Sequence, residues 1–431
     1  MSTRSVKILL LLAGLCAAQE TPKAPIDAAA ESIKAAALEK HLKHLASDDL
    51  EGRNTGYPGN DKASEYIAEH FRKIGLAPVG DKDDGGKPTY WQHFKVGKRT
   101  TRNCVGWVEG TDEKLKAELV VIGAHHDHVG KSGQSDAGRM RSATEDPDDK
   151  IWNGADDNGS GTVTVLEIAR AFMEGKVRTK RSVLFMTFSG EEYGLLGSIH
   201  YCEHPIFPLA GTVAMINLDM VGRNPEKRME VGGVGTSADW EGLLKAAAEG
   251  TGVRYLTTRE VSQGSDHFSF AQKRVPAVHF FTGFHGDYHC QSDHPDRIAY
   301  ANMEKIGRFG VRLLAGIAEA PERPKPSFKA QPKKLGIMGE DLRAREAEEA
   351  GLGEEEGGIR LTTISAGSPA EAAGFRAGDL LVEFDGKRLP RDGAMTELRE
   401  LIAGAKAGVD IPVVVLRDGK RTKLKVRWEE K

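Results

Sequence analysis

Cysteine is scarce in this 431-residue chain: only four are present. One of them, Cys16, lies in an N-terminal segment with the character of a removable leader. The other three, Cys104, Cys202 and Cys290, allow at most one internal disulfide and leave one thiol free. This excludes a small disulfide-stapled scaffold, so the fold must depend on a buried core.

A surplus of positive charge is also lacking, since the formal net charge is −3. A basic surface for nucleic acid is therefore not expected, and no acidic block indicates a charged tail. No apolar run reaches the ~20 residues that a membrane-spanning helix needs, so no transmembrane segment is predicted. With 39% hydrophobic and 29% charged residues, the composition is that of a globular protein. The length predicts two or three domains.

The first 18 residues predict a signal peptide. Arg4 and Lys7 form a basic start, a short apolar stretch follows up to Leu15, and small residues then permit cleavage before Gln19. We therefore expect a secreted or periplasmic protein. Anchoring as a lipoprotein through Cys16 is a less favoured alternative, because Leu15 is large for the residue before a lipidated cysteine.

Residues 19–35 are polar and rich in alanine, and we expect them to form a poorly ordered lead-in. Beyond them, apolar strand-like runs alternate with helical patterns. Four runs are continuously apolar, as expected of strands buried on both faces. Such alternation predicts an α/β fold with a mostly parallel central sheet and helices on both faces. The four predicted strands are residues 119–123, 182–188, 212–218 and 277–281.

Polar clusters follow these four strands, and in such sheets ligands bind beyond the carboxyl ends of the strands. The clusters read AHHDH (124–128), GADDNGSG (154–161), SGEEYGLLGS (189–198), LDM (218–220) and DYHCQSDH (287–294). Together they bring two histidines and at least three carboxylates to one edge. Imidazole and carboxylate without thiolate favour a catalytic zinc site. The donors are too many for one zinc with an open position, and they suit two metals that share a carboxylate.

These motifs resemble the di-zinc aminopeptidases of metallopeptidase clan MH, which includes bacterial leucyl aminopeptidases and glutamate carboxypeptidase. The resemblance covers roughly residues 38–315 and implies a phosphorylase/hydrolase-like zinc peptidase fold with two Zn²⁺ per chain. It implies that His125 and Asp219 hold one zinc, Glu192 and His289 hold the other, and Asp157 bridges both. It also implies a cis peptide bond after Asp157.

The resemblance further implies that Glu191 is the catalytic general base. Two carboxylates are candidates for orienting the ligand imidazoles from behind. Asp127 stands two residues after His125, on the same side of an extended segment, and Asp293 could serve His289 in the same way. Other nearby side chains are predicted to support the site rather than to bind metal: His126, His128, Cys290, His294 and residues 265–267.

The stretch 320–332 is rich in proline and predicts a semi-rigid linker. The following residues, 333–431, resemble a PDZ domain, a small α+β module, most specifically in SPAEAAGFRAGDLLVEFDG. Such modules add a peptide as an extra strand and hold its terminal carboxylate in a nest of backbone N–H groups. Leu335, Gly336, Ile337 and Met338 are the candidate nest, and the expected partners are protein C-termini. The predicted organisation is a signal peptide (1–18), a di-zinc peptidase domain (19–319), the linker (320–332) and the PDZ-like domain (333–431).

The function predicted from these features is a zinc-dependent aminopeptidase acting on peptides. A carboxypeptidase or a glutaminyl cyclase of the same clan is an alternative, because these enzymes share the motifs. A third reading is a receptor-like protein without catalysis, which the complete ligand set and Glu191 argue against.

Overall fold

Four buried parallel strands form the centre of the first sheet, in the spatial order β5, β4, β6, β9. The computed structural model describes residues 25–135, 138–140, 148–328 and 334–429. The strands β4, β5, β6 and β9 are the four that were predicted from apolar runs, and β4 continues two residues further than expected. Their bounds are β4 (Leu119–His125), β5 (Ser182–Phe188), β6 (Thr212–Leu218) and β9 (Ala277–Phe281).

Five further strands extend this sheet at both ends and run mostly antiparallel to their neighbours. On one side β3 pairs with β5, and β1 and β2 pair with β3; on the other side β7 pairs with β9, and β8 lies parallel to β7. The mostly parallel α/β fold is thus confirmed, with antiparallel edges. The added strands are β1 (Ala77–Pro78), β2 (Trp91–Val96), β3 (Arg99–Val108), β7 (Met229–Gly232) and β8 (Tyr255–Thr257).

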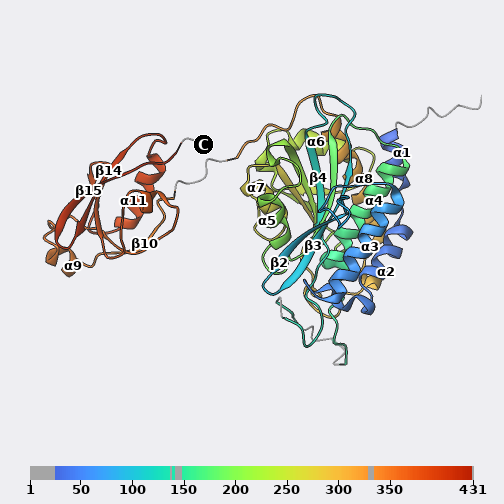
Figure 1. Ribbon diagram of the computed structural model, residues 1–431, viewed down its shortest axis with the longest axis horizontal. Coiled ribbons are helices and arrows are strands. Elements are labelled where there is room, and N and C mark those ends of the chain that lie inside the picture. The colour runs from blue at the N-terminus through green and yellow to red at the C-terminus, as the bar shows by residue number, and fades with distance from the viewer. Residues whose placement is uncertain (1–24, 136–137, 141–147, 329–333, 430–431) are drawn as a thin grey trace, which may run out of the picture. The chain divides into compact units, whose positions relative to one another are not determined.

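Helices cover both faces of the sheet (Figure 1). Alternate residues of β4 point to opposite sides, as the strand period of two requires. Val120 and Ile122 join the larger apolar cluster, under α3, α4 and α8, whereas Val121 joins the smaller one, with side chains of α5 and α7. The helices are α1 (Pro25–Ser32), α2 (Ala35–Leu45), α3 (Pro58–Ile74), α4 (Gly161–Glu174), α5 (Leu196–Glu203), α6 (Trp240–Ala248), α7 (His267–Gln272) and α8 (Tyr300–Glu319).

The lead-in was expected to be poorly ordered as far as residue 35, and this was wrong for its second half. Helix α1 occupies Pro25–Ser32, and its Ala29 and Ala30 are buried. Their small side chains let α1 approach closely, since a Cβ added at Gly175 after α4 would lie 2.8 Å from the Cβ of Ala29. The predicted signal peptide and its Cys16 lie outside the described residues. None of the helices that the structure describes is long and apolar enough to cross a bilayer.

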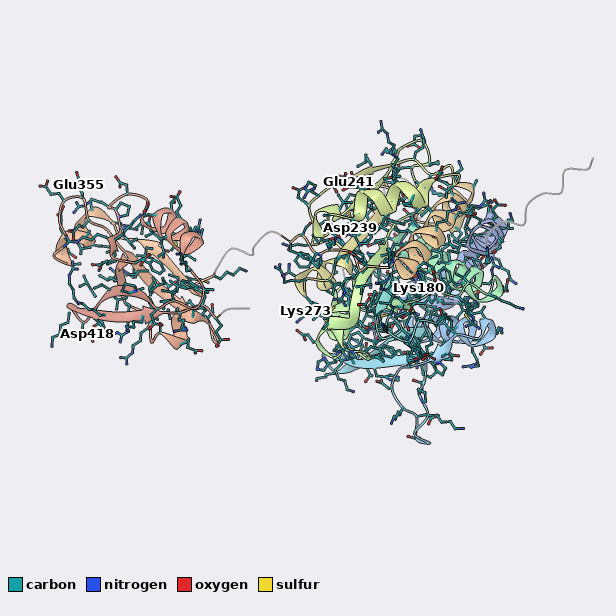
Figure 2. The ribbon with its side chains drawn as sticks, turned by 90° about the horizontal axis from the view of Figure 1, so that it is seen from above. Lys180, Asp239, Glu241, Lys273, Glu355 and Asp418 are labelled. Atoms are coloured by element: carbon teal, nitrogen blue, oxygen red, sulfur yellow. The ribbon has the colours of Figure 1, made fainter. Side chains whose placement is uncertain are left out.

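The chain divides into two compact units, Met1–Phe328 and Lys329–Lys431. The first eight or so residues of the proline-rich stretch lie on the first unit. The backbone N–H of Lys325 donates to Asp239, which is labelled in Figure 2, and that of Ser327 donates to the Thr236 carbonyl. The guanidinium of Arg274 lies 5.3 Å from the ring centre of Phe328. Of the predicted linker, the described part up to Phe328 is therefore docked on the peptidase-like unit.

The second unit is an antiparallel sheet in the order β10, β11, β12, β14, β15, with β13 beside β12. Its own apolar core includes Leu361, Phe384, Leu398 and Val413. The strands are β10 (Ile337–Asp341), β11 (Ile359–Ile364), β12 (Leu380–Phe384), β13 (Lys387–Arg388), β14 (Ile411–Arg417) and β15 (Lys420–Val426), and the helices are α9 (Ala344–Glu349), α10 (Pro369–Ala372) and α11 (Ala394–Gly404).

Candidate metal centre

The first group of metal donors lies at the carboxyl ends of β4, β5 and β6. His125 is the last residue of β4, Asp219 directly follows β6, and Glu191 follows β5 by three residues. The Nε2 atom of His125 lies 3.4 Å from Oδ1 of Asp219 and 3.9 Å from Oε2 of Glu191. One donor atom from each residue falls within 4.8 Å of the others.

The second donor group contains Asp157, Glu192, His289 and also His128. The Nε2 atom of His289 lies 3.0 Å from Oδ2 of Asp157 and 3.0 Å from Oε2 of Glu192. All four side chains are more than nine-tenths buried. The structure thus brings four residues into one cluster, although they are spread along the sequence from His128 to His289.

Asp157 joins the two groups through its two carboxylate oxygens. Oδ1 lies 3.4 Å from Nε2 of His125, and Oδ2 lies 3.0 Å from Nε2 of His289. Asp157 sits in the short segment Ala155–Ser160 that opens α4, and its peptide bond to Asn158 is cis, as the resemblance implied. A shared carboxylate between two donor groups is the arrangement of a two-metal centre.

The donor set fits zinc or a similar divalent ion. It contains imidazole nitrogens and carboxylate oxygens, the ligands that catalytic zinc sites use. Three buried atoms there have no hydrogen-bond partner among the described residues: Oδ1 of Asp219, Nε2 of His128 and Nε2 of His289. Because a buried polar atom without a partner costs free energy, a bound cation would satisfy Oδ1 of Asp219.

Asp127 lies behind His125, but its backbone oxygen rather than its carboxylate is within hydrogen-bond distance of the imidazole. Nδ1 of His125 is 3.2 Å from the backbone oxygen of Asp127 and 3.7 Å from its carboxylate. The carboxylate accepts hydrogen bonds from the Thr55 hydroxyl at 2.7 Å and from the Glu191 backbone at 3.2 Å. Asp127 therefore positions two neighbours at once, a ligand imidazole and the backbone of Glu191.

Asp293 does not orient His289, contrary to the prediction. Nδ1 of His289 lies 3.0 Å from the backbone oxygen of Gly138 instead. The carboxylate of Asp293 is fully buried and accepts the backbone N–H groups of Asp156, at 2.8 Å, and Asp157, at 3.1 Å. These two N–H groups open a helical segment and need an acceptor, which is the reason the side chain turns that way.

His128 contributes more than the sequence suggested. It was expected to be a supporting residue, because the five-residue ligand set that the resemblance implies is complete without it. Strand β4 ends at His125, however, and the chain then turns so that Nδ1 of His128 lies 2.8 Å from Oε1 of Glu192. His126 stays outside both donor groups, and burial lowers its pKa to about 3.

Arg53, from the loop before α3, is a supporting residue that the sequence analysis missed. Its guanidinium is fully buried and donates to the backbone oxygens of Leu45, His126, Asn153 and Gly154. Burial lowers the pKa of Arg53 to about 10, which leaves it charged near neutrality. This buried arginine clamps the two loops that carry His125 and Asp157.

Glu191 lies in an environment that favours a bound proton. Burial raises its pKa well above the ordinary value, His125 opposes this, and Glu192, Asp219 and Asp266 add to it. Asp266 comes from the SDH motif that was set aside as supporting, and it is fully buried, with a pKa of about 7 caused mainly by burial. A carboxyl group whose pKa is raised toward neutrality can take up and release a proton there.

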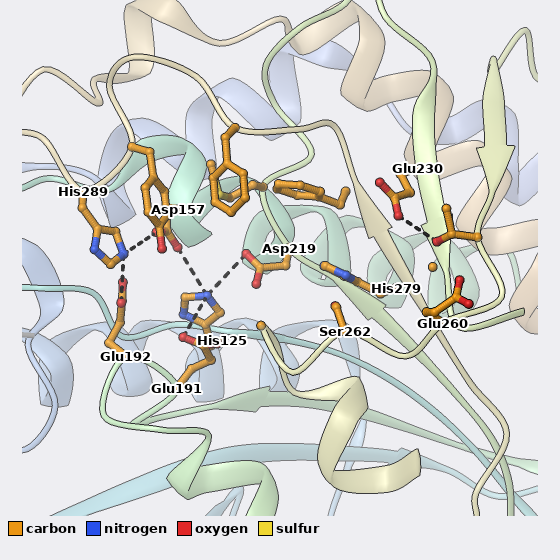
Figure 3. A pocket seen from close by; sticks show the side chains of 17 residues that line it. His125, Asp157, Glu191, Glu192, Asp219, Glu230, Glu260, Ser262, His279 and His289 are labelled. Atoms are coloured by element: carbon orange, nitrogen blue, oxygen red, sulfur yellow. Dashed lines mark hydrogen bonds and ion pairs between the residues drawn. The ribbon is translucent and has the colours of Figure 1, made fainter. Parts of the chain in front are cut away.

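Both donor groups open into one cavity of about 570 Å³ (Figure 3). Its walls include Met220, Phe281, Phe284 and Tyr288, and at the far end from His289 lie Glu230 and Glu260. Cys104, Cys202 and Cys290 are buried, and no disulfide joins them. Cys290 and His294 lie outside the donor groups.

The candidate nest Leu335 to Met338 lines a cavity of about 470 Å³ in the second unit. Met395, Leu398 and Ile402 of α11 and the cation Arg399 line the same cavity. Strand β10 is at the edge of its sheet, where β11 is its neighbour. An edge strand beside a helix leaves room for one further strand, which is how such modules take up a peptide.

Fold and site together define the class: an α/β protein with a candidate two-metal centre at the carboxyl edge of its sheet, followed by a small β-rich module. Residues 103–313 match the model of peptidase family M28, and residues 335–427 match that of the PDZ domain. The chain therefore carries a family M28 peptidase domain followed by a PDZ domain.

Among curated proteins, the chain is 29% identical over 293 residues to the aminopeptidase YwaD of Bacillus subtilis, covering 63% of this chain and 58% of YwaD. It is 27% identical over 265 residues to leucine aminopeptidase 2 of Arthroderma otae, covering 54% of this chain and 48% of that protein. The chain thus spans about half the length of these relatives.

Among solved structures, the LapA aminopeptidase of Legionella pneumophila matches with a TM-score of 0.54 and 23% identity, over 69% of this chain and 75% of LapA. The zinc aminopeptidase BSAP of Bacillus subtilis matches with a TM-score of 0.52 and 18% identity, over 67% of this chain and 96% of BSAP. At this identity both confirm the fold.

Proposed function

We propose that this protein is a zinc-dependent aminopeptidase that binds two zinc ions per chain. The observation that carries the proposal is Asp157, whose two carboxylate oxygens face His125 on one side and His289 on the other. The family M28 match and the two aminopeptidase relatives support the same function.

In this proposal His125 and Asp219 hold one metal, Glu192 and His289 hold the other, and Asp157 belongs to both. His128, 2.8 Å from Glu192, would hold that carboxylate in place or add a nitrogen ligand. Two zinc ions at such a site supply an activated water and polarise the carbonyl of the scissile bond.

Glu191 is the proposed general base. Its backbone N–H is fixed by Asp127, and its carboxylate faces His125 in the shared cavity. It would accept a proton as water attacks and deliver that proton to the departing amine nitrogen.

The N-terminal direction of cleavage follows from the charge of the cavity. Among the residues that the structure describes, six carboxylates line the cavity and no lysine or arginine does, so a free α-ammonium group would be attracted. The test is one peptide in three forms: free, N-acetylated and C-amidated. We expect kcat/KM to fall at least about a hundredfold on acetylation, since a charge contact is lost in the transition state, and to change little on amidation.

Equal cleavage of free and acetylated peptide would overturn the aminopeptidase assignment. Loss on amidation alone would identify a carboxypeptidase. A glutaminyl cyclase would convert a peptide with N-terminal glutamine to the cyclised form without shortening it, which mass spectrometry separates from hydrolysis.

For the PDZ domain we propose binding of peptide C-termini beside β10. The apolar residues of α11 and the cation Arg399 in the cavity suit an apolar last residue and its carboxylate. The test is binding of a labelled peptide with an apolar C-terminus, with its C-amidated form as the control. Equal affinity for both forms would refute carboxylate recognition.

Secretion to the periplasm or outside the cell is proposed from residues 1–18 alone. Cell fractionation together with N-terminal sequencing tests it, and the expected first residue of the mature chain is Gln19. A chain that keeps residues 1–18 and stays in the cytoplasm would refute it.

A further inference from the structure

The cavity next to the candidate metal centre has a second acidic end that neither donor group uses. Four of its six carboxylates belong to those groups: Asp157, Glu191, Glu192 and Asp219. The other two, Glu230 and Glu260, lie together at the opposite end (Figure 3). We call this end of the cavity, with Glu230 and Glu260, the acidic arm.

An aromatic wall leads from the donor groups to the acidic arm. The ring of Tyr288 stacks on His289 at 4.0 Å, Phe284 meets Tyr288 at 4.9 Å, and Phe281 meets Phe284 at 5.0 Å between centres. Phe284 is 64% exposed, although it is large and apolar. An exposed phenylalanine in the wall of a cavity is a surface on which an aliphatic stem or a guanidinium can lie.

Strand pairing places Glu230 at the end of this wall. In the antiparallel pair of β7 and β9, Glu230 stands opposite Phe281 and Gly232 stands opposite His279. Residues directly opposite one another project to the same face, so the carboxylate of Glu230 and the ring of Phe281 share the cavity. Gly232 has no side chain, which leaves the space between Glu230 and His279 open.

The carboxylates of the acidic arm can still accept hydrogen bonds from a ligand. The hydroxyl of Thr258 donates to Oε1 of Glu230 at 2.7 Å and fixes its direction. Among the described residues, neither Glu230 nor Glu260 has a lysine or arginine within salt-bridge distance, whereas Glu118, for example, pairs with Arg181. Glu230 is half-buried and Glu260 is exposed, and two carboxylates beside an apolar wall attract a cationic ligand by their charge.

His279 supplies a separate sign that a ligand binds there. It lines the cavity between Asp219 and the two glutamates and is only 8% exposed, and its Nε2 has no hydrogen-bond partner among the described residues. Its ring stacks on His267 at 4.5 Å and on Phe281 at 5.6 Å, so it is held in place. A fixed, buried nitrogen without a partner is satisfied when a polar ligand group enters the arm.

We propose that the acidic arm receives the positively charged side chain of an N-terminal lysine or arginine, with Glu230 and Glu260 as its anionic partners. This inference rests on the proposed aminopeptidase function, because it assigns the arm to the first residue of the substrate. The long stem lies along Phe281 and Phe284, and the charged head reaches Glu230. Aromatic rings and carboxylates together suit a guanidinium, which both stacks and forms paired hydrogen bonds.

The experiment compares substrates that differ in charge and little in shape. The aminoacyl p-nitroanilides of arginine and citrulline form one pair, and those of lysine and norleucine form the other. We expect kcat/KM to favour the charged member at least about tenfold at low salt, and less at 0.5 M salt because of screening. In Glu230→Gln/Glu260→Gln the ratio should fall to near one.

Glu226→Gln is the matched control, because Glu226 is exposed in the chain just before β7 and does not line the cavity. It removes the same kind of charge and should keep the arginine-to-citrulline ratio. A ratio near one in the native protein, or a ratio that the double variant leaves unchanged, would overturn the proposal.

A binding measurement distinguishes a failure of this inference from a failure of the proposed function. Calorimetry with argininamide and citrullinamide on the metal-loaded protein needs no turnover. Tighter binding of argininamide without hydrolysis of any anilide would refute the aminopeptidase and retain the arm. Hydrolysis with equal affinity for both amides would retain the aminopeptidase and refute the arm.

Discussion

The carboxylate of Asp293 accepts a hydrogen bond from the backbone N–H of Asp157 at 3.1 Å, although 136 residues separate them. The same oxygen accepts the N–H of Asp156 at 2.8 Å. The loop after β9, which carries His289, therefore positions the backbone of the residue shared by both donor groups. Two of the loops that build the candidate metal centre are held to each other by one buried carboxylate.

Asp293→Ala should weaken metal binding about 10- to 100-fold, the usual effect of removing a group that supports a ligand. The reason is that the N–H groups of Asp156 and Asp157 lose their acceptor. Competition with a chelator measures the affinity without relying on activity. Asp296→Ala, three residues later and exposed, should leave the affinity unchanged. Native affinity in Asp293→Ala would show that the hydrogen bonds do not position Asp157.

Glu191→Gln and Asp157→Asn should separate catalysis from metal binding. Loss of the base is expected to lower kcat about 10²–10⁴-fold while the protein keeps about two zinc ions. Asp157→Asn should lose metal as well as activity, because the shared carboxylate is gone. Elemental analysis and steady-state kinetics on both variants check this. Near-native kcat in Glu191→Gln would assign the base to another group.

Arg53→Met should destabilise the peptidase unit by about 3 kcal/mol or more. Four backbone oxygens lose a buried charged donor, and each unsatisfied group costs about 1–3 kcal/mol. Denaturant unfolding of the metal-free protein measures the loss. Arg72→Met is the control, since Arg72 is exposed on α3 and should change stability by less than about 0.5 kcal/mol. A similar small effect for Arg53→Met would contradict the role of the clamp.

A chain that ends at Phe328 should be stable and active on small aminoacyl substrates, whereas one that ends at Glu319 should melt at lower temperature. The difference lies in the docked segment, which hydrogen-bonds to Asp239 and Thr236 and places Phe328 beside Arg274. Calorimetric melting curves of both chains decide it. Equal melting temperatures would mean that the docked segment adds nothing to the stability of the unit.

His70 predicts a pH dependence of stability away from the metal centre. Burial and, next, the charge of His41 lower its pKa from 6.5 to about 4. Between these values the unfolded chain binds a proton that the folded chain refuses, so the free energy of unfolding falls as the pH drops from 6.5 to 4. The contribution is on the order of 1 kcal/mol per pH unit.

His70→Gln should reduce this loss, and urea unfolding at several pH values between 7 and 4 measures it. The environment of His70 also contains Glu167 and Arg170, which keep their charge over most of this range and are common to both proteins. His204→Gln, at an exposed position, is the control. An identical pH profile for the native protein and His70→Gln would refute the prediction.

The sequence alone predicted the four central strands of the sheet and the gathering of most donor residues at one edge. Apolar runs such as Leu119 to Gly123 can be buried on both faces only in the middle of a covered sheet. Polar residues that follow parallel strands must meet at one edge, whatever lies between them in the chain. The gathering of His125, Asp157 and His289 needed no knowledge of individual contacts.

Only the tertiary structure decided which side chain touches which. Asp293 turned toward the backbone of Asp157 instead of toward His289, because two N–H groups at a helix start needed an acceptor. His128 reached Glu192 because the chain bends after β4, which strand alternation cannot anticipate. Glu230 came to line the cavity through the pairing of β7 with β9, and Glu260 through the chain after β8, where its backbone oxygen accepts the N–H of Gly233. Such contacts depend on loop paths and strand register between distant segments, and local sequence patterns carry no information about either.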